Sequence, residues 1–175
     1  MTLVVVQDNP ALPERFRGAM RGVASTVCIV SAPTAKGPRG MAATAVMSLS
    51  LDPPSLAVAV SRSATLNPSV IEGAPVSIHV LAEDQADIAR AFGGGLPPDM
   101  RFTVGWWSAD AWGCPMLEDA AASLSCIVER RVELETHSLL VARVRAVRTA
   151  PGTRPLLYAQ GRFTALADPA CQPAA

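Results

Sequence analysis

The stretch SLSLDPP, residues 48–54, determines how the chain turns. Two consecutive prolines fix φ and remove backbone donors, so the chain must reverse direction after Asp52. Before this corner, Ser48 and Ser50 lie on one face of an incoming strand, because side chains alternate along a strand. After it, the apolar run 56–60 predicts a buried returning strand, which ends at a small polar cluster over 61–65. Together these features predict a ligand cradle rather than an ordinary hairpin.

Similar apolar runs separated by turn residues predict strands on both sides of the corner. We expect strands over 26–31, 41–50, 56–60, 76–81, 123–134, 138–149 and 156–166. We expect short helices over 13–24, 67–73 and 83–92, the first of them capping the barrel. The hairpin-like connections argue against alternating βαβ units, and the sequence contains neither a G-x-G-x-x-G fingerprint nor a P-loop. The pattern therefore predicts a mainly β fold, an antiparallel barrel of six or seven strands with two or three short helices.

The organisation along the chain indicates one domain. We expect a flexible N-terminus over 1–11, a single domain over 12–167 and a flexible tail over 168–175. Within the domain, residues 93–115 form a loop rich in glycine, proline and tryptophan that is too long for a simple connector. We expect this loop to cover a ligand or a partner.

Charge and hydropathy narrow the class of partner. The chain has 175 residues, with fifteen basic and fifteen acidic side chains, so it has no basic field for nucleic acid or an anionic membrane. A mean hydropathy of +0.28 beside a net charge of zero indicates an extensive subunit interface. Four cysteines without a C-x-x-C pair or a metal-cage spacing predict free thiols, no metal site and a reducing, cytoplasmic compartment. The apolar run 3–6 is too short for a signal peptide or a membrane span.

Three sets of polar residues are candidates for chemistry. The hydroxyls of Thr44, Ser48 and Ser50 can hydrogen-bond a planar heteroaromatic ring, although the same alternation also fits a solvent-facing strand side. The cluster 61–65 can bind a phosphate through hydroxyls and backbone N–H groups, although an ordinary loop would look similar. His137 opens a strand beside polar residues, where its side chain can face a pocket or fill a structural role.

These motifs resemble those of the flavin reductase-like family of flavin-binding split barrels, the small reductase components of two-component monooxygenases. The resemblance rests on the S-x-S-x-D-P-P corner, the S-x-T element at 63–65 and the closing PLLY segment at 155–158. It implies a Greek-key split β-barrel that forms a homodimer, with the flavin near the subunit boundary.

The resemblance also implies roles for individual residues. His137 would approach the nicotinamide of the reduced cofactor, although this chain has Glu135-Thr136-His137 where relatives have Gly-Asp-His. Ala42 and Ala43 stand where relatives commonly carry polar residues, which implies fewer side-chain hydrogen bonds to the flavin ring. The implied cofactor contacts are Thr44, Val46, Met47, Ser48, Leu49, Ser50, Asp52, Arg62, Ser63, Ala64, Thr65, Phe92, Arg101, Phe102, Tyr158, Gly161 and Arg162.

The function that the resemblance implies is an NAD(P)H-dependent flavin reductase. It would transfer a hydride from NADH or NADPH to FMN or FAD and supply the reduced flavin to a separate oxygenase component. Two alternatives stay open: a flavin- or haem-binding carrier or sensor without hydride transfer, and a reductase whose final acceptor is a bound metal-containing species.

Overall fold

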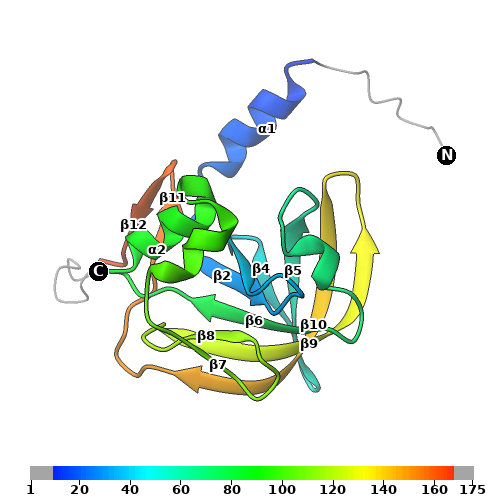
Figure 1. Cartoon of the computed structure of the whole chain (residues 1–175). Coiled ribbons are helices and arrows are strands. Elements are labelled where there is room, and N and C mark those ends of the chain that lie inside the picture. Colours follow the sequence, from blue (N-terminus) through cyan, green and yellow to red (C-terminus); the bar gives the residue numbers. More distant parts are fainter. Residues whose placement is uncertain (1–9, 168–175) are drawn as a thin grey trace.

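The computed structural model describes residues 10–167, which fold around one seven-stranded antiparallel sheet. The sheet order is β3-β2-β6-β9-β10-β5-β4. Its strands are β2 (Cys28–Ala32), β3 (Arg39–Ala43), β4 (Val46–Leu51), β5 (Pro54–Ser61), β6 (Pro75–Val80), β9 (Ala122–Glu133) and β10 (His137–Thr149). The connection from β5 to β6 spans the ends of β9 and β10, which is a Greek-key crossing. The predicted mainly β, antiparallel barrel is confirmed (Figure 1).

The split in the barrel lies between β3 and β4. The sequence predicts one strand over 41–50, whereas the structure breaks it at Thr44 and Ala45. The strand before the break forms one edge of the sheet and the strand after it forms the opposite edge. Two residues of linker cannot span a flat seven-stranded sheet, so the sheet has to curl until its edges approach each other. The Ala59 N–H donates to the Ala45 carbonyl at 3.0 Å, which holds the linker against β5.

Two other predicted strands are also interrupted. The expected strand over 26–31 divides at Val27 into β1 (Ser25–Thr26) and β2. The expected strand over 156–166 is a hairpin of β11 (Leu157–Ala159) and β12 (Arg162–Thr164), because Gln160 and Gly161 adopt positive φ and turn the chain. β1, β11 and β12 form a small second sheet.

The helices and the long loop surround one end of the barrel. The predicted helix over 83–92 is α2 (Ala86–Arg90), which continues as the π-helical turn η2 (Ala91–Gly95). The predicted helix over 67–73 is shorter, a 3₁₀ turn η1 (Asn67–Ser69). Residues 93–115, expected to be a loop, contain a second 3₁₀ turn, η3 (Pro98–Thr103), and the strand β7 (Trp107–Ala109). β7 pairs with β8 (Pro115–Leu117), which begins at the last residue of this segment. None of the helices within residues 10–167 is long and apolar enough to cross a membrane.

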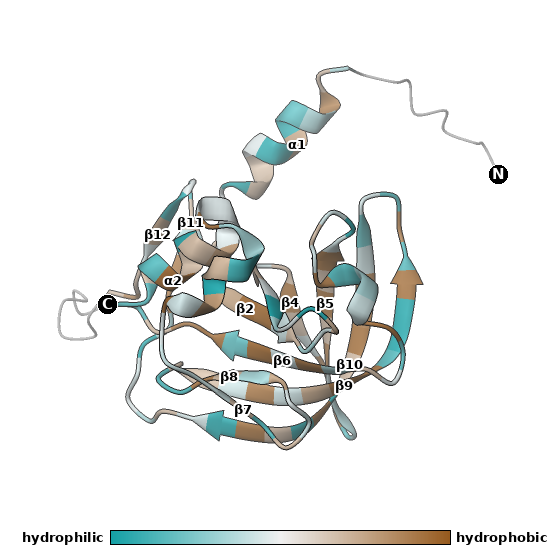
Figure 2. Cartoon of the chain, in the orientation of Figure 1, coloured by the Kyte–Doolittle hydropathy of each residue, from teal (hydrophilic) through white to brown (hydrophobic). Residues whose placement is uncertain are grey.

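The apolar core has two parts, one on each side of the sheet. Figure 2 shows hydrophobic residues concentrated along β5, β6, β9 and β10. Val58, Val60 and Leu140 lie in the barrel interior, while Ile88, Phe92 and neighbouring residues form a second cluster beneath α2. Burial raises the pKa of the Cys28 thiol to about 12, so this cysteine is a neutral core residue.

The outer face of β6 carries a buried polar layer under β7 and β8. His79 is fully buried, its Nδ1 lies 2.9 Å from the Ser123 hydroxyl, and its Nε2 lies 3.1 Å from the Pro115 carbonyl oxygen. The ring of Trp107 meets the imidazole edge-on, with 5.4 Å between the ring centroids. Burial lowers the pKa of His79 to about 4, so the imidazole is neutral at pH 7.

The first helix does not cap the barrel as expected. α1 (Leu12–Met20) buries none of its residues and projects away from the sheet (Figure 1). Its apolar side chains Leu12, Phe16 and Met20 follow each other at intervals of four residues, so they lie along one face of the helix. All three are exposed in the single chain.

Candidate functional site

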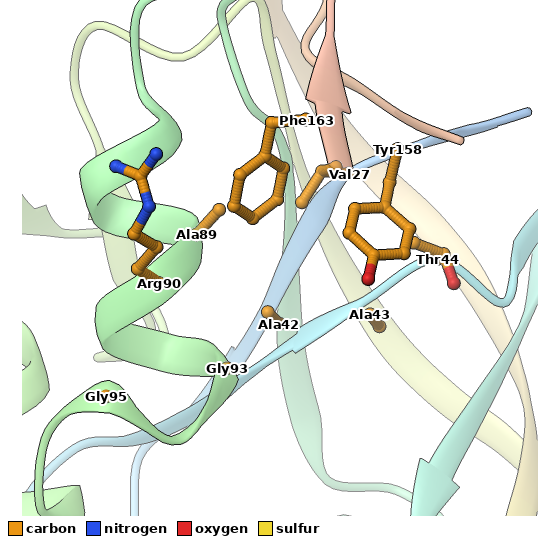
Figure 3. A pocket seen from close by; sticks show the side chains of 10 residues that line it. All are labelled: Val27, Ala42, Ala43, Thr44, Ala89, Arg90, Gly93, Gly95, Tyr158 and Phe163. Atoms are coloured by element: carbon orange, nitrogen blue, oxygen red, sulfur yellow. The ribbon is translucent and has the colours of Figure 1, made fainter. Parts of the chain in front are cut away.

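A pocket of about 570 Å³ lies along the open edge of β3, between α2 and the β11–β12 hairpin (Figure 3). We call it the edge pocket. It is lined by Val27, Ala42, Ala43, Thr44, Ala89, Arg90, Gly93, Gly95, Tyr158 and Phe163. Most of these residues are small or aromatic, a composition that suits a flat, largely apolar ligand.

The wall of the pocket made by β3 offers backbone groups as well as small side chains. β3 pairs only with β2, so alternate backbone N–H and C=O groups point away from the sheet. The Gly40 carbonyl faces this open side, because it accepts a hydrogen bond from Arg101 Nη1 at 2.8 Å. Backbone direction repeats every two residues, so the N–H and C=O of Ala42 face the same side. The alanines at 42 and 43 therefore leave the backbone accessible to a ligand.

A close approach of η2 to β3 forms the opposite wall. A Cβ at Gly40 would lie 2.7 Å from a carbon of the Phe92 ring, and Phe92 is only 2% exposed and cannot move aside. Glycine at position 40 thus allows the η2 turn to pack directly on the strand. Gly93 and Gly95 of the same turn then border the pocket without side chains.

Aromatic residues of the β11–β12 hairpin close the third side. Tyr158 and Phe163 face each other across the hairpin, with 5.4 Å between ring centroids, and the Tyr158 hydroxyl points toward Ala43 and Thr44 (Figure 3). The Arg90 guanidinium lies 5.5 Å from the Phe163 ring centroid and 2.6 Å from the Asp87 carboxylate. This wall therefore has two aromatic rings and one guanidinium group, whose charge is balanced by the Asp87 carboxylate.

Of the residues predicted from the sequence, the edge pocket brings together Thr44 and Tyr158, which are 114 positions apart. Gly161 and Arg162 lie in the turn and second strand of the same hairpin, and both are exposed. Sequence reasoning missed Val27, Ala89, Arg90 and Phe163 as pocket residues. Gly93 and Gly95 belong to the segment 93–115, which the sequence predicts to cover a ligand or a partner, although no motif marks these two glycines as pocket residues.

The corner segment lines a different space. Val46, Met47, Ser48 and Ser50 border a pocket of about 470 Å³ that opens into the apolar interior of the barrel. A β-bulge between Ser48 and Ser50 places two residues opposite one on β5, which interrupts the expected alternation. Thr44 lies beyond the strand break, so the expected single face of three hydroxyls does not exist. Leu49 is half exposed, and the backbone N–H of Asp52 donates to the Ser50 hydroxyl in the turn.

A third group gathers where β5 ends and β10 begins. His137 pairs with Ser61 across these strands, and Thr136 Oγ1 lies 2.9 Å from the His137 Nδ1. The Ser61 and Ser63 hydroxyls are 2.8 Å apart, and both Ala64 and Thr65 follow in the same loop. The predicted phosphate cluster and the predicted nicotinamide-facing histidine are therefore neighbours in space.

Arg62 of this cluster is already engaged with the β9–β10 turn. Its backbone N–H donates to the Thr136 carbonyl at 2.9 Å, and its Nη1 donates to the Leu134 carbonyl at 3.2 Å. These bonds tie the β5–η1 loop to the turn that precedes His137.

The remaining predicted contacts, Phe92, Arg101 and Phe102, support the walls of the edge pocket. The rings of Phe92 and Phe102 pack edge-on with centroids 5.0 Å apart, and Trp107 completes the cluster. Arg101 is partly buried, which lowers its pKa, and it donates through Nε to the Leu96 carbonyl at 3.2 Å. Their direct contact with a cofactor stays a prediction.

The described residues fit a flavin at the edge pocket. A flat ring can enter between the glycine-bearing η2 turn and Tyr158, and the exposed backbone of Ala42 can meet the hydrogen-bonding rim of such a ring.

Comparison with known proteins identifies the family of the chain. The family model described as flavin reductase like domain matches residues 20–167. FMN reductase (NADH) RutF of Variovorax paradoxus is 35% identical over 161 residues, which covers 91% of this chain and 89% of the relative. RutF of Klebsiella pneumoniae is 35% identical over 156 residues, covering 89% of this chain and 95% of the relative.

Solved structures have the same architecture. The NADH:FAD oxidoreductase SgcE6 of Streptomyces globisporus, in complex with NAD and FAD fragments, superposes with a TM-score of 0.84 at 25% identity, over 93% of this chain and 97% of that one. BorF, the flavin reductase component of a bacterial two-component tryptophan halogenase, superposes with a TM-score of 0.80 at 29% identity, over 89% and 99%. The family model, the relatives at 35% identity and the shared split barrel show that the chain belongs to the flavin reductase-like domain family.

Proposed function

We propose that the protein is an NADH-dependent flavin reductase that binds flavin in the edge pocket. The observation that carries the proposal is the pocket itself: an exposed strand edge faced by glycines and aromatic rings, in a chain of the flavin reductase-like family. A bound flavin accepts a hydride from reduced nicotinamide, so the protein has to orient two rings rather than supply an acid or a base.

The residues of the pocket have separate tasks in this proposal. The backbone of Ala42 and the hydroxyl of Thr44 bind the polar rim of the ring, while Gly93 and Gly95 leave space for it. Tyr158 limits the open side. His137, exposed at the start of β10, orients the carboxamide-bearing ring of the nicotinamide, with its Nδ1 position fixed by Thr136.

FMN and NADH are the favoured pair. The RutF relatives at 35% identity are named FMN reductase (NADH), whereas the less similar SgcE6 is named an NADH:FAD oxidoreductase. We therefore propose FMN as the preferred flavin, with FAD as a second substrate, and NADH over NADPH.

A homodimer is part of the proposal. α1 exposes Phe16 and Met20, and β4 exposes Met47 and Leu51, so the single chain leaves two apolar surfaces uncovered. Surfaces of this kind are normally buried against another chain. Light scattering of the purified protein is expected to give twice the monomer mass.

The product would be reduced flavin for a separate oxygenase component. BorF is named the flavin reductase component of a two-component tryptophan halogenase, which supports a two-component arrangement here. The three described cysteines are free thiols, which supports a reducing, cytoplasmic location.

Anaerobic oxidation of NADH and NADPH by the purified protein, with FMN or FAD in excess, tests the proposal. Rapid NADH oxidation that depends on added FMN is the expected result. Stoichiometric flavin binding without any nicotinamide oxidation would overturn the reductase and favour the carrier or sensor.

A further inference from the structure

A second pocket lies at the other end of β3, beside the predicted phosphate cluster. It has a volume of about 580 Å³, and we call it the lysine pocket. Its walls come from the β2–β3 turn, the β5–η1 loop and the start of η3. The lining residues are Thr34, Ala35, Lys36, Arg39, Thr65, Pro68, Ser69, Pro98 and Asp99. In contrast to the edge pocket, it has no aromatic ring in its walls, and three of its nine lining residues are charged.

Lys36 is the only lysine of the chain, and the turn that carries it is well defined. The Lys36 backbone N–H donates to Thr34 Oγ1 at 3.1 Å, and the same hydroxyl donates to the Gly37 carbonyl at 2.6 Å. Gly37 has φ of 88°, a conformation that suits glycine and completes the turn. The turn therefore holds the Lys36 backbone in place at the rim of the pocket.

The charges of the pocket leave Lys36 without a counterion. Arg39 forms an ion pair with Asp99 at 2.5 Å, so these two charges neutralise each other. For Lys36, no ion pair or side-chain hydrogen bond is present among residues 10–167. The pocket therefore has one uncompensated positive charge.

Thr65, the last residue of the predicted phosphate cluster, also lines this pocket. A phosphate monoester carries close to two negative charges at pH 7, and hydroxyls alone cannot neutralise them. The cationic residue inside the cluster, Arg62, already donates to the Leu134 carbonyl. Lys36 is a second cation near the cluster, and it lines the same pocket as Thr65.

We propose that the Lys36 ammonium binds the phosphate group of the flavin nucleotide in the lysine pocket, which Thr65 also lines. The inference rests on the proposed function, because it assumes that a flavin ring occupies the edge pocket. Arg39 borders the lysine pocket and Ala42 the edge pocket, so they are separated by three residues of one strand, about 10 Å at the usual rise per residue. A ribityl phosphate chain spans a length of this order.

The test compares FMN with riboflavin, which has the same ring and no phosphate. Binding is measured by quenching of flavin fluorescence, which requires no turnover. For Lys36→Ala, the dissociation constant of FMN is expected to rise roughly tenfold or more, because a charge-assisted hydrogen bond is lost. The dissociation constant of riboflavin is expected to stay unchanged, and Lys36→Arg is expected to retain most of the affinity for FMN.

Arg145→Gln is the matched control, since Arg145 is exposed on β10 and lines neither pocket. It removes one positive charge and is expected to leave FMN binding unchanged, which separates a local contact from a general charge effect.

Two results would overturn the proposal. One is equal weakening of FMN and riboflavin by Lys36→Ala. The other is unchanged FMN binding together with a lower preference for NADPH over NADH, which would assign Lys36 to the 2′-phosphate of the nicotinamide cofactor. Because fluorescence reports flavin binding directly, a protein that binds FMN but oxidises no NADH would refute the proposed reductase and still test Lys36.

Discussion

The two ends of strand β3 border pockets of opposite character. At the Ala42–Thr44 end, the walls are glycines, alanines and the rings of Tyr158 and Phe163. At the Arg39 end, they are Lys36, an Arg39–Asp99 ion pair and the Thr65 hydroxyl. The two ends of one edge strand therefore border a pocket that suits a flat ring and a pocket that suits an anion. The proposed flavin nucleotide has the same two parts, an aromatic ring and a charged phosphate.

Filling the aromatic end is expected to have the largest effect. Thr44 is exposed and lines the edge pocket, so Thr44→Trp places an indole where the flavin ring would bind without disturbing the core. We expect FMN and riboflavin binding to be lost together, in contrast to the selective effect at Lys36. Fluorescence titration with both flavins measures this.

Thr149→Trp, at the exposed end of β10, adds the same bulk outside both pockets and serves as the control. Thermal unfolding of the two variants shows whether the fold is retained. Normal flavin affinity in Thr44→Trp would place the ring elsewhere, and the comparison between the two ends of β3 would fail.

The next largest effect is expected at His137, which lies outside both pockets beside Ser61. Loss of one hydrogen bond to the nicotinamide is expected to lower kcat/KM for NADH roughly tenfold in His137→Ala. The affinity for FMN should not change, because the imidazole belongs to neither end of the flavin site. Anaerobic stopped-flow reduction measures the first quantity and fluorescence titration the second.

His137→Gln keeps a hydrogen-bonding side chain of similar length and is expected to recover part of the rate. An unaltered NADH rate in His137→Ala would mean that the nicotinamide approaches the flavin from another side of the barrel.

A smaller effect is expected at Tyr158, which forms only one side of the edge pocket. Removing the ring in Tyr158→Ala should weaken FMN and riboflavin equally, by roughly fivefold, the lower end of the about 1–3 kcal/mol that stacking on a base is worth. Tyr158→Phe retains the ring and its contact with Phe163, so it should bind flavin almost normally. A loss specific to FMN would contradict the assignment of Tyr158 to the aromatic end.

The smallest effect near neutral pH is expected from lowering the pH. This affects His79, which supports the segment next to the lysine pocket. η3 carries Asp99 and is followed by β7, whose Trp107 rests on the buried His79. The pKa of His79 is about 4 in the folded protein against an ordinary value of 6.5, so the unfolded chain takes up the proton first. Stability is then fully present above pH 6.5 and is lost as the pH falls toward 4.

The expected loss in free energy of unfolding is under about 1 kcal/mol between pH 7 and pH 6, and about 2 kcal/mol by pH 5. Urea unfolding at these pH values measures it. In His79→Gln the absolute stability will also change, but this part of the pH dependence should disappear. A pH dependence identical to that of the wild type would show that His79 is not the titrating group.

The sequence alone was sufficient for the two longest strands, the proline corner and the family. Apolar alternation predicts β9 and β10 to within one residue at each end, and the corner at 52–54 forms the predicted turn between β4 and β5. These features depend on neighbours in the chain, through the period of two and the restricted φ of proline. The expected flexible segments 1–11 and 168–175 lie almost entirely outside the described residues, and the domain limits 12–167 stay a prediction.

Only the tertiary structure decided where the candidate site lies. The break at Thr44 and Ala45 turns one predicted strand into the two edges of the barrel, and this exposes the backbone of β3 as a wall. Tyr158 and Thr44 line one pocket, and Lys36 and Thr65 line another, although each pair comes from segments far apart in the chain. No local pattern contains such contacts, because they follow from sheet order and from the packing of η2 against Gly40. Residue types and local periodicity thus determined which elements form, while long-range strand pairing determined which side chains meet.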